Sequence, residues 1–579
     1  MAGIAGWVAP ARRGGDEGAL ASMLGALEHR GMQGLCGYVD QSERRQAVLG
    51  AALCDRPARI ALVLDGALVN AAELRAQLAR HGFRFSGQSD EEVLLRAYQY
   101  WDKDALKHLR GAFALALWDA RKDRLLLARD RFGEKPLYLH EDKGALYFGS
   151  EAKALLEAGV PAKVDLCALW DCLAYRYVPG PRTLFAGIRK LAPASYALWQ
   201  SGKLHEARYW TPPDRHAYVD KGAPADAVAG LLACLEDAVK LQRAGGVLLS
   251  GGLDSAVLLA LTCANGGPAP RTFSLGLEGE RASELPHARA LAKHFGAAHE
   301  EIVVAPRELA ALLPKLVAAR DAPLARASDL AVHRLAREAA RGAKTVLTGD
   351  GCDEIVGGYR RYLADCICGG VDAFPARLLA PLVSAGRFDR AAAELKLDGW
   401  RYRLFTNPKQ MGTKAQTPVQ EHGASRLRQA LYADQTGWLP DQLLERNDRA
   451  AAAASLDARM PFLDHRVAEY VSALPDGQRV RGLTTKWILR EAGRRLIPQP
   501  LARLRKGGWR IDAGGWLRNE LRELTLEHLQ SASSVTRRYY DPAALDRVLE
   551  EHLKGKKNHE TLLWTLLNLE IWHRTYSPG

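Results

Sequence analysis

The segment 246–255 brings together residue types that suit phosphate binding, in the order Gly-Val-Leu-Leu-Ser-Gly-Gly-Leu-Asp-Ser. Its apolar run at 247–249 predicts a buried strand, its glycines predict a tight turn, and the apolar run at 256–263 predicts a helix. Backbone N–H groups at such a turn bind anions, and Ser250 and Ser255 add hydroxyl donors. Asp254 beside a phosphate implies a cation between the two, so we predict a pyrophosphate-binding loop with one Mg²⁺ ligand. The alternative is a plain strand–turn–helix, and a Walker A loop is excluded because no Gly-Lys-Ser/Thr follows.

A second glycine-rich turn follows the apolar run 345–347 and carries Asp350, Asp353 and Glu354. Three carboxylates within five residues repel one another unless cations or hydrogen-bond donors lie among them. Asp353 would therefore complement Asp254 as a second Mg²⁺ ligand. Taken alone, the same turn also fits an acidic surface turn with a helix cap.

A lysine and an arginine, Lys486 and Arg490, have the spacing that places two side chains on one helical face. A lysine near the two loops could offset the negative charge that develops as a phosphoanhydride breaks. An isolated lysine–arginine pair of this kind usually lies on a surface-exposed helix face. The presence of the two loops is what favours a chemical role for the lysine.

The elements that must position these residues form two groups, which meet near residue 211. Before it, apolar runs bounded by turn residues predict the strands of an α+β domain, at 60–66, 112–118, 124–129 and 145–149. The polar, proline-containing stretch 211–224 predicts a linker. After it, predicted strands alternate with predicted helices: strands at 247–249, 272–277, 301–304 and 345–347, helices at 288–294 and 330–341. This alternation indicates an α/β domain with a doubly wound parallel sheet, whose ligands bind beyond the carboxyl ends of the strands.

The turns after Leu249, Leu275 and Leu347 should therefore share one pocket. From about residue 424 the sequence predicts mainly helices, the last of them an amphipathic helix at 562–572. We accordingly predict a domain at 1–210 and a second domain at 211–579.

Composition limits the class of protein. The chain has 579 residues, 47% of them hydrophobic and 25% charged, which is ordinary for a globular protein. No apolar stretch is long enough to span a membrane and no leader is evident, so we expect a cytoplasmic location and no membrane partner. The nine cysteines form no Cys-x-x-Cys pair, which argues against zinc and for reduced thiols. The net charge of +13 is dispersed along the sequence, which fits either a solvated basic surface or the attraction of an anionic substrate such as ATP. No recognised nucleic-acid-binding module is found in the sequence, so nucleic acid is not predicted as a partner.

Several longer motifs resemble those of asparagine synthetase B and its relatives, from one end of the chain to the other. The matching segments are SGGLDS at 250–255, TGDGCDEIVGGYRRY at 348–362, the DR and SLDARMPFLDHR parts of 448–466, KWILRE at 486–491, RDRFGEKPLYL at 129–139 and FGSEAKAL at 148–155. The resemblance implies an N-terminal glutaminase-like sandwich of the Ntn type. It also implies a C-terminal ATP pyrophosphatase (PP-loop) domain with a helical extension.

The family chemistry needs ATP and Mg²⁺. A carboxylate attacks the α-phosphate of ATP to give an acyl-adenylate and pyrophosphate, and an amine then displaces AMP to form an amide. By position, the resemblance implies that Lys486 stabilises the transition state, that Asp254 and Asp353 bind Mg²⁺, and that Asp350 orients or deprotonates the amine. The residues implied to bind the nucleotide are Leu249, Ser250, Gly251, Gly252, Asp254, Ser255, Leu275, Thr348 and Gly349. Asp321, Ser328 and Asp329 fall near the same pocket by resemblance alone.

The N-terminal domain departs from the family at its nucleophile. The family has a cysteine after the initiator methionine, and its thiolate attacks glutamine. Here Ala2 follows Met1, and Asp65 and Ala67 stand where the family has the asparagine and glutamate of its NGE motif. The family segments HRGPD and RLSI are also altered, at 29–33 and 51–55, while Ser89-Asp90 remains. We therefore predict a folded but inactive glutaminase domain, whether Ala2 is natural or engineered.

An inactive glutaminase leaves ammonia or a substrate amine as the nucleophile. The leading prediction is an AMP- and PPi-forming ligase that joins a small-molecule carboxylate to such an amine in specialised biosynthesis. The alternative is an intramolecular cyclase of the β-lactam synthetase or lasso-peptide cyclase type. β-Lactam synthetases activate an internal amine with a Tyr–Glu pair, whose positions here are Asp350 and Glu445. Glu445 is either a surface helix residue or the partner of Asp350.

Two further classes are weaker. A tRNA-modifying enzyme would fit the positive charge but not the N-terminal half of the chain, and a non-catalytic scaffold would not need Asp254, Asp353 and Lys486. A homodimer is possible on the resemblance to the family.

Overall fold

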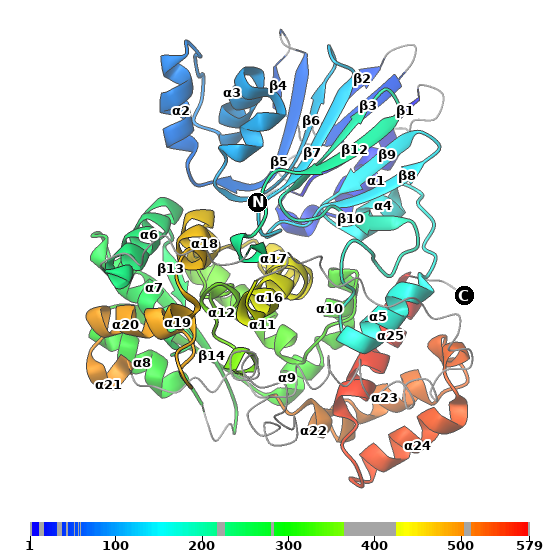
Figure 1. The fold of residues 1–579 in the computed structure, drawn as a ribbon. Coiled ribbons are helices and arrows are strands. Elements are labelled where there is room, and N and C mark those ends of the chain that lie inside the picture. Colours follow the sequence, from blue (N-terminus) through cyan, green and yellow to red (C-terminus); the bar gives the residue numbers. More distant parts are fainter. Residues whose placement is uncertain are drawn as a thin grey trace.

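Two antiparallel sheets precede one parallel sheet along the chain, as Figure 1 shows with the N-terminal sheets in blue and cyan. The protein is seen here as a computed structural model. It describes residues 3–10, 17–31, 37–41, 45–50, 53–55, 57, 59–216, 226–279, 283–363, 424–502 and 511–576.

The first sheet has the strand order β10-β8-β9-β1-β3-β2, and the second has the order β12-β11-β7-β6-β5-β4. The strands of the first are β1 (Ala5–Pro10), β2 (Gly37–Gln41), β3 (Arg45–Gly50), β8 (Tyr138–Asp142), β9 (Ala145–Gly149) and β10 (Ile188–Lys190). The strands of the second are β4 (Leu53–Asp55), β5 (Ile60–Leu68), β6 (Gly111–Asp119), β7 (Arg124–Arg129), β11 (Ser195–Gln200) and β12 (Lys203–Arg208). All four strands predicted in this half are present as β5, β6, β7 and β9.

One apolar core lies between these two sheets, because alternate side chains of both enter it. Val8 and Phe148 come from the first sheet, and Val63 and Trp118 from the second. The outer faces are covered by helices, α1 (Glu17–Gly25) and α4 (Ala152–Glu157) on the first sheet, and α2 (Ala71–Arg80) and α3 (Asp90–Trp101) on the second. The result is the sandwich that the resemblance implied, with helices on both of its outer faces.

The parallel sheet has the order β15-β14-β13-β16-β17. Its strands are β13 (Gly246–Leu248), β14 (Arg271–Leu277), β15 (Ala298–Val304), β16 (Thr345–Leu347) and β17 (Asp457–Arg459). Strands β13, β14, β15 and β16 confirm the four predicted strands. Strand β17 was not predicted, because Asp457 and Arg459 flank a single alanine and give no apolar run. The edge strand β17 is only half buried, so charged side chains are tolerated there.

Helices pack on both faces of this sheet, which confirms the doubly wound fold. Val247 and Leu347 face a core shared with α6 (Ala227–Gln242), α7 (Leu253–Ala264), α8 (Leu285–His294), α18 (His465–Ser472) and α20 (Trp487–Leu496). Phe273 and Val346 face the opposite core, which contains α9 (Pro306–Ala310), α10 (Leu313–Arg320) and α11 (Ser328–Gly342).

The chain beyond residue 424 is mainly helical, as predicted. Its further helical segments include α16 (Arg426–Ala433), the π-helical η5 (Asp434–Leu444), α17 (Glu445–Ala452), α22 (Ala513–Arg518), α23 (Arg522–Leu529), α24 (Pro542–Leu553) and α25 (Glu560–Tyr576). The amphipathic prediction for α25 was wrong, because every residue from Leu563 to His573 is buried. The helix runs through a core, and the indoles of Trp564 and Trp572 donate to the carbonyls of Leu324 and Asp321.

The predicted linker is in part a packed segment. Asp214 is buried and accepts hydrogen bonds from Arg479 at 2.8 Å and Arg428 at 3.3 Å. Residues 217–224 of the predicted linker lie outside the described residues.

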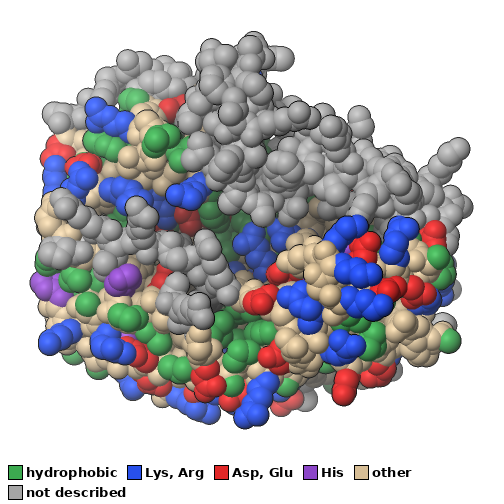
Figure 2. Space-filling view, turned by 90° about the horizontal axis from the view of Figure 1, so that it is seen from below, with side chains coloured by type: hydrophobic (Ala, Val, Ile, Leu, Met, Phe, Trp, Pro, Cys, Tyr) green, Lys and Arg blue, Asp and Glu red, His purple; other side chains and the backbone are tan. Residues whose placement is uncertain are grey.

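Charged side chains of both signs lie on the face that Figure 2 shows. Figure 2 shows Lys and Arg side chains interspersed with Asp and Glu over one face, which is hollowed near its centre. Among the described residues, no helix combines the length and the hydropathy needed to cross a bilayer.

Candidate active site

The first loop connects β13 to α7 and brings its polar groups to the start of a 12-residue helix. Gly251 has φ +76°, a backbone conformation that favours glycine. The Ser255 hydroxyl accepts a hydrogen bond from the Ser250 N–H at 3.2 Å and donates to the Gly252 carbonyl at 3.1 Å. These bonds hold the loop in a tight turn around the N-terminus of α7, where free N–H groups attract anions.

The second loop connects β16 to α12 (Cys352–Val356) and lies directly against the first. A Cβ on Gly349 would come within 2.9 Å of the Asp254 Cβ, so only a glycine allows this approach. Strands β13, β14 and β16 are adjacent and parallel, so the turns that follow Leu249 and Leu347 leave the same edge of the sheet. The predicted turn after Leu275 was wrong, because β14 continues to Leu277.

Lys486 joins the two loops. Its Nζ lies 2.7 Å from both carboxylate oxygens of Asp254 and 2.6 Å from Oδ1 of Asp353. Burial by itself would lower the pKa of Lys486, but the two carboxylates raise it well above its usual value. The buried lysine is therefore charged.

The local backbone aims Lys486 between the two carboxylates. The residue precedes α20 in a left-handed conformation, with φ +53°, and it is buried, whereas Arg490 is exposed. The prediction that Lys486 and Arg490 share one helical face was therefore wrong, because Lys486 lies outside the helix. Gly358 packs against the lysine, since a Cβ there would lie 1.8 Å from Asp353 Oδ1 and 2.1 Å from Lys486 Cε.

The two carboxylates fit a Mg²⁺ site of the kind completed by a substrate. Mg²⁺ is usually held by one or two carboxylates together with phosphates and water. Asp254 and Asp353 lie within reach of one cationic group, Lys486, beside the anion-binding loop. No group of three or more His, Cys, Asp or Glu residues in the described part of the chain forms an all-protein metal site. Cys352, which the sequence did not single out, adds a thiol 3.4 Å from Asp254 Oδ1.

Asp350 is held beside this centre by two groups. Thr348 Oγ1 donates to Asp350 Oδ2 at 2.5 Å, and the Arg446 guanidinium lies 3.5 Å from Oδ1. Arg446 also lies 3.8 Å from Asp329, whose own side chain is buried and pairs with Arg320 at 3.2 Å. The sequence did not predict Arg446, although it follows Glu445 directly.

Glu445 is engaged elsewhere. It is buried, so the interpretation as a surface residue was wrong. Lys190 Nζ lies 2.7 Å from Glu445 Oε2, and the Tyr138 hydroxyl donates to Oε1 at 2.8 Å. Burial would raise the pKa of Glu445, but Lys190 and two arginines lower it to about 2. Among the described residues, no hydrogen bond or ion pair joins Glu445 to Asp350.

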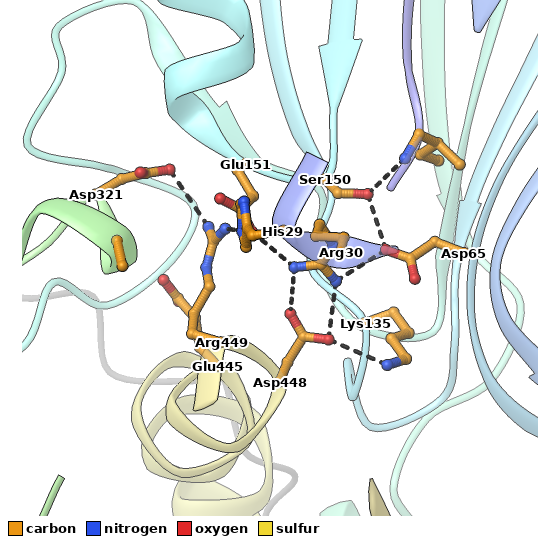
Figure 3. A network of polar contacts seen from close by, with 12 residues as sticks. His29, Arg30, Asp65, Lys135, Ser150, Glu151, Asp321, Glu445, Asp448 and Arg449 are labelled. Atoms are coloured by element: carbon orange, nitrogen blue, oxygen red, sulfur yellow. Dashed lines mark hydrogen bonds and ion pairs between the residues drawn. The ribbon is translucent and has the colours of Figure 1, made fainter. Parts of the chain in front are cut away.

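A buried ionic network links the N-terminal sandwich to α17, as Figure 3 shows. Arg30 donates to Asp65 at 3.0 Å, to Glu151 at 2.8 Å and to both oxygens of Asp448 at 2.9 and 3.0 Å. Lys135 reaches Asp448 at 3.1 Å. Burial would raise the pKa of Asp448, but Arg30 and Lys135 lower it to about 2, so this carboxylate remains charged.

The same network includes the next residue of α17. Arg449 pairs with Glu151 and lies 3.5 Å from Asp321. Glu445, Asp448 and Arg449 are spaced by three and four residues, so they lie on one face of α17, and that face is turned to the N-terminal domain. Asp321 therefore belongs to this network and not to the Lys486 centre.

The glutaminase-like positions carry altered groups. The Asp65 carboxylate is fully buried and accepts hydrogen bonds from Arg30 and from Ser150 at 2.9 Å. Ala67 offers no side-chain polar group, and Asp90 accepts the Leu68 N–H at 2.7 Å. Ala2 and the altered residues 32–33 and 51–52 lie outside the described residues.

Comparison with known proteins gives two family matches. A family described as asparagine synthase matches residues 230–574, and one described as a glutamine amidotransferase domain matches residues 1–210. A Mycobacterium bovis homologue that carries the name of a glutamine-hydrolyzing asparagine synthetase is 32% identical, over 100% of this chain and 97% of its own length. Asparagine synthetase 1 of Bacillus subtilis is 28% identical, over 88% of this chain and 85% of its own length. An amidase of Penicillium rubens is 26% identical, over 83% of this chain and 82% of its own length.

Proposed function

The chain belongs to the asparagine synthase family of ATP-dependent ligases, and from this premise we propose that it activates a small-molecule carboxylate as an acyl-adenylate, with release of pyrophosphate. An amine then displaces AMP to form the amide. The observation that supports this proposal most directly is Lys486, held between Asp254 and Asp353 beside the loop 250–255. A buried cation at an anion-binding turn suits the cleavage of a phosphoanhydride.

Each part of the centre has a defined task in this proposal. The loop residues Ser250, Gly251, Gly252 and Ser255 bind the pyrophosphate portion of ATP through N–H and hydroxyl donors. Leu249, Leu275, Thr348 and Gly349 contact the rest of the nucleotide. Asp254 and Asp353 would hold Mg²⁺, which would neutralise phosphate charge. Lys486 offsets the charge that develops on the leaving pyrophosphate, and Asp350 orients or deprotonates the amine.

We propose further that the glutaminase-like domain does not hydrolyse glutamine. Ala2 has no thiol, and Ala67 has no polar group for a substrate. Asp65 is committed to Arg30 and Ser150 inside the ionic network. The amine is therefore free ammonia or an amine carried by a substrate, in a specialised biosynthetic reaction. No disulfide joins the cysteines that the structure describes, which favours a reducing compartment such as the cytoplasm.

The test is pyrophosphate release from MgATP with a panel of carboxylates, each with ammonium, with glutamine or with no added amine. We expect release that depends on the carboxylate, and amide formation with ammonium but not with glutamine. Amide formation with glutamine would contradict the inactive glutaminase. Release from no carboxylate in the panel, with the Lys486→Gln variant giving the same background, would contradict the ligase proposal.

The cyclase alternative makes a different prediction in the same assay. A cyclase would release pyrophosphate only with a substrate that carries its own amine. It would also need Asp350 and Glu445 for amine activation, so unchanged turnover of Glu445→Gln with that substrate would remove Glu445 from the chemistry.

A further inference from the structure

A cavity of about 430 Å³, partly open to solvent, lies where the N-terminal domain meets η5, α17 and the end of α10. Among the described residues that line it, none comes from the loops 250–255 or 348–354, so it is separate from the Lys486 centre. Part of its lining is apolar, and the residues of that part are Ala152, Val178, Leu184, Phe185, Ala322 and Pro323. The charged part consists of Lys190, Arg320, Asp321, Asp441 and Glu445.

The three carboxylates of the cavity are committed to protein donors, and each has a hydrogen bond on both of its oxygens. The donors are Tyr138 and Lys190 to Glu445, Gly180 at 2.7 Å and Lys190 at 3.4 Å to Asp441, and Tyr576 and the Lys153 N–H, both at 3.2 Å, to Asp321. A cation that enters the cavity therefore meets carboxylates whose charge is already shared with the protein's own donors.

The two cationic groups of the cavity, in contrast, keep unused N–H groups. Arg320 donates to Asp329 at 3.2 Å and to Gln442 Oε1 at 2.7 Å, but its Nε–H is buried and has no partner in the described part of the chain. Lys190 has three N–H groups and two carboxylate partners. A buried donor without a partner costs free energy, so Arg320 indicates an acceptor that the protein itself does not supply.

The thiol of Cys172 keeps the surroundings of Arg320 free of a further negative charge. Cys172 belongs to α5 (Leu166–Tyr175), is fully buried and lines the cavity. Burial raises the pKa of this thiol to about 12, although the charge of Arg320 opposes the shift. The thiol is therefore neutral near pH 7 and does not serve as an anionic partner for Arg320.

Arg320 also connects the cavity to the ligase centre through a chain of ion pairs. Its partner Asp329 lies 3.8 Å from Arg446, and Arg446 lies 3.5 Å from Asp350. The oxygen of Asp329 that faces Arg446 is buried and has no hydrogen bond within the described residues. Arg446 is thus shared at long distance between Asp329 and Asp350, and the charge balance at Arg320 affects how it is shared.

We propose that this cavity binds a small carboxylate with an apolar body, and that this ligand acts as an effector of the ligase centre. Unused N–H groups of Arg320 and Lys190 select an acceptor, and a guanidinium binds a carboxylate with charge-assisted hydrogen bonds. The apolar part of the lining selects a hydrocarbon substituent. A carboxylate at Arg320 competes with Asp329, which then draws Arg446 away from Asp350. The effector role rests on the proposed function, whereas the binding does not.

The first test measures the unfolding midpoint with isovalerate, a branched carboxylate. We expect isovalerate to raise the midpoint of the unaltered protein in a saturable manner. Isovaleramide has the same shape without the charge, and inorganic phosphate has the charge without the hydrocarbon, so neither should change the midpoint. An equal shift with isovaleramide or with phosphate would overturn the proposed class of ligand.

Variants of the lining locate the binding. Ala322→Leu fills part of the cavity without removing a charge and should abolish the midpoint shift. The matched control is Ala311→Leu, at an exposed alanine, which should keep the shift. Arg320→Lys keeps the charge but loses the guanidinium fork, and it should weaken isovalerate binding about tenfold. If Arg320→Lys does not fold, Ala322→Leu decides, because an equal shift in Ala322→Leu and in the unaltered protein would overturn the inference.

The second test distinguishes an effector from an acyl substrate. With acyl substrate at saturation, isovalerate should slow amide formation about fivefold without changing the exchange of pyrophosphate into ATP, and Ala322→Leu should remove this effect. Exchange supported by isovalerate itself, or unchanged amide formation with isovalerate bound, would overturn the effector role. Absence of exchange with every carboxylate would instead contradict the proposed function, and the midpoint measurement would still decide the cavity.

Discussion

Replacing Glu445 by glutamine should destabilise the protein strongly, because it removes one member of a buried ion pair. The pKa of Glu445 falls from 4.5 to about 2 in the folded protein. Each pKa unit corresponds to about 1.4 kcal/mol, so the charged form contributes about 3 kcal/mol to folding at neutral pH. Loss of one partner from a buried pair costs roughly 3–5 kcal/mol by general experience, and the two figures agree.

The pH dependence gives the sign of the effect. Because folding lowers this pKa, the stabilisation is fully present above pH 4.5 and is lost as the pH falls toward 2. Urea unfolding, followed by tryptophan fluorescence, should therefore show a constant deficit for Glu445→Gln from pH 7 to about pH 5. The deficit should shrink at lower pH, wherever the unaltered protein still folds.

Two controls complete this experiment. Glu206→Gln breaks an exposed pair with Arg189 and should cost only about 0–1 kcal/mol. The double variant Lys190→Gln/Glu445→Gln should lose less than the sum of its single variants, because each single change leaves one buried charge unpaired. An unfolding midpoint for Glu445→Gln equal to that of Glu206→Gln would refute the reasoning.

Three other substitutions test the site and the interface. Gly358→Ala should reduce pyrophosphate release at least about 100-fold with little loss of stability, because the added Cβ displaces Asp353 and Lys486. The control is Gly477→Ala, whose Cβ would have nothing within 4 Å, and it should change neither pyrophosphate release nor stability. Lys486→Gln should lower kcat about 10²–10³-fold in the same assay, and an effect confined to the KM for ATP would contradict its role in the transition state. Asp448→Asn should lower the unfolding midpoint by an amount equivalent to about 3 kcal/mol, and an unchanged midpoint would show that Arg30 and Lys135 do not need this carboxylate.

Local patterns in the sequence predicted the elements well where apolar runs mark them. The strands at 60–66, 112–118, 124–129 and 145–149 were found because their buried faces need apolar side chains. Strand β17 was missed because an edge strand with Asp457 and Arg459 shows no such run. The last helix was recognised but assigned a polar face, since the sequence does not show that tertiary packing buries Leu563 to His573.

The residues of the Lys486 centre were predicted, but their geometry was not. Glycine spacing identified both loops, while the left-handed backbone at Lys486 became visible only in the folded chain. The interface network gave no local signal at all, because Arg30 and Asp448 are separated by 418 positions. Contacts over such distances depend on how the two domains pack, which no single segment encodes.

Helix α17 shows why an inactive domain would be retained. One face of the helix presents Glu445, Asp448 and Arg449 to Lys190, Arg30 and Glu151 of the N-terminal domain. Arg446, the neighbour of Glu445, contacts Asp350 of the ligase centre. Without the N-terminal domain, the charges on the first face would lose their partners and the helix its fixed position. If glutamine chemistry is lost as proposed, the domain keeps a structural role, because its buried charges hold the helix that carries Arg446 to Asp350.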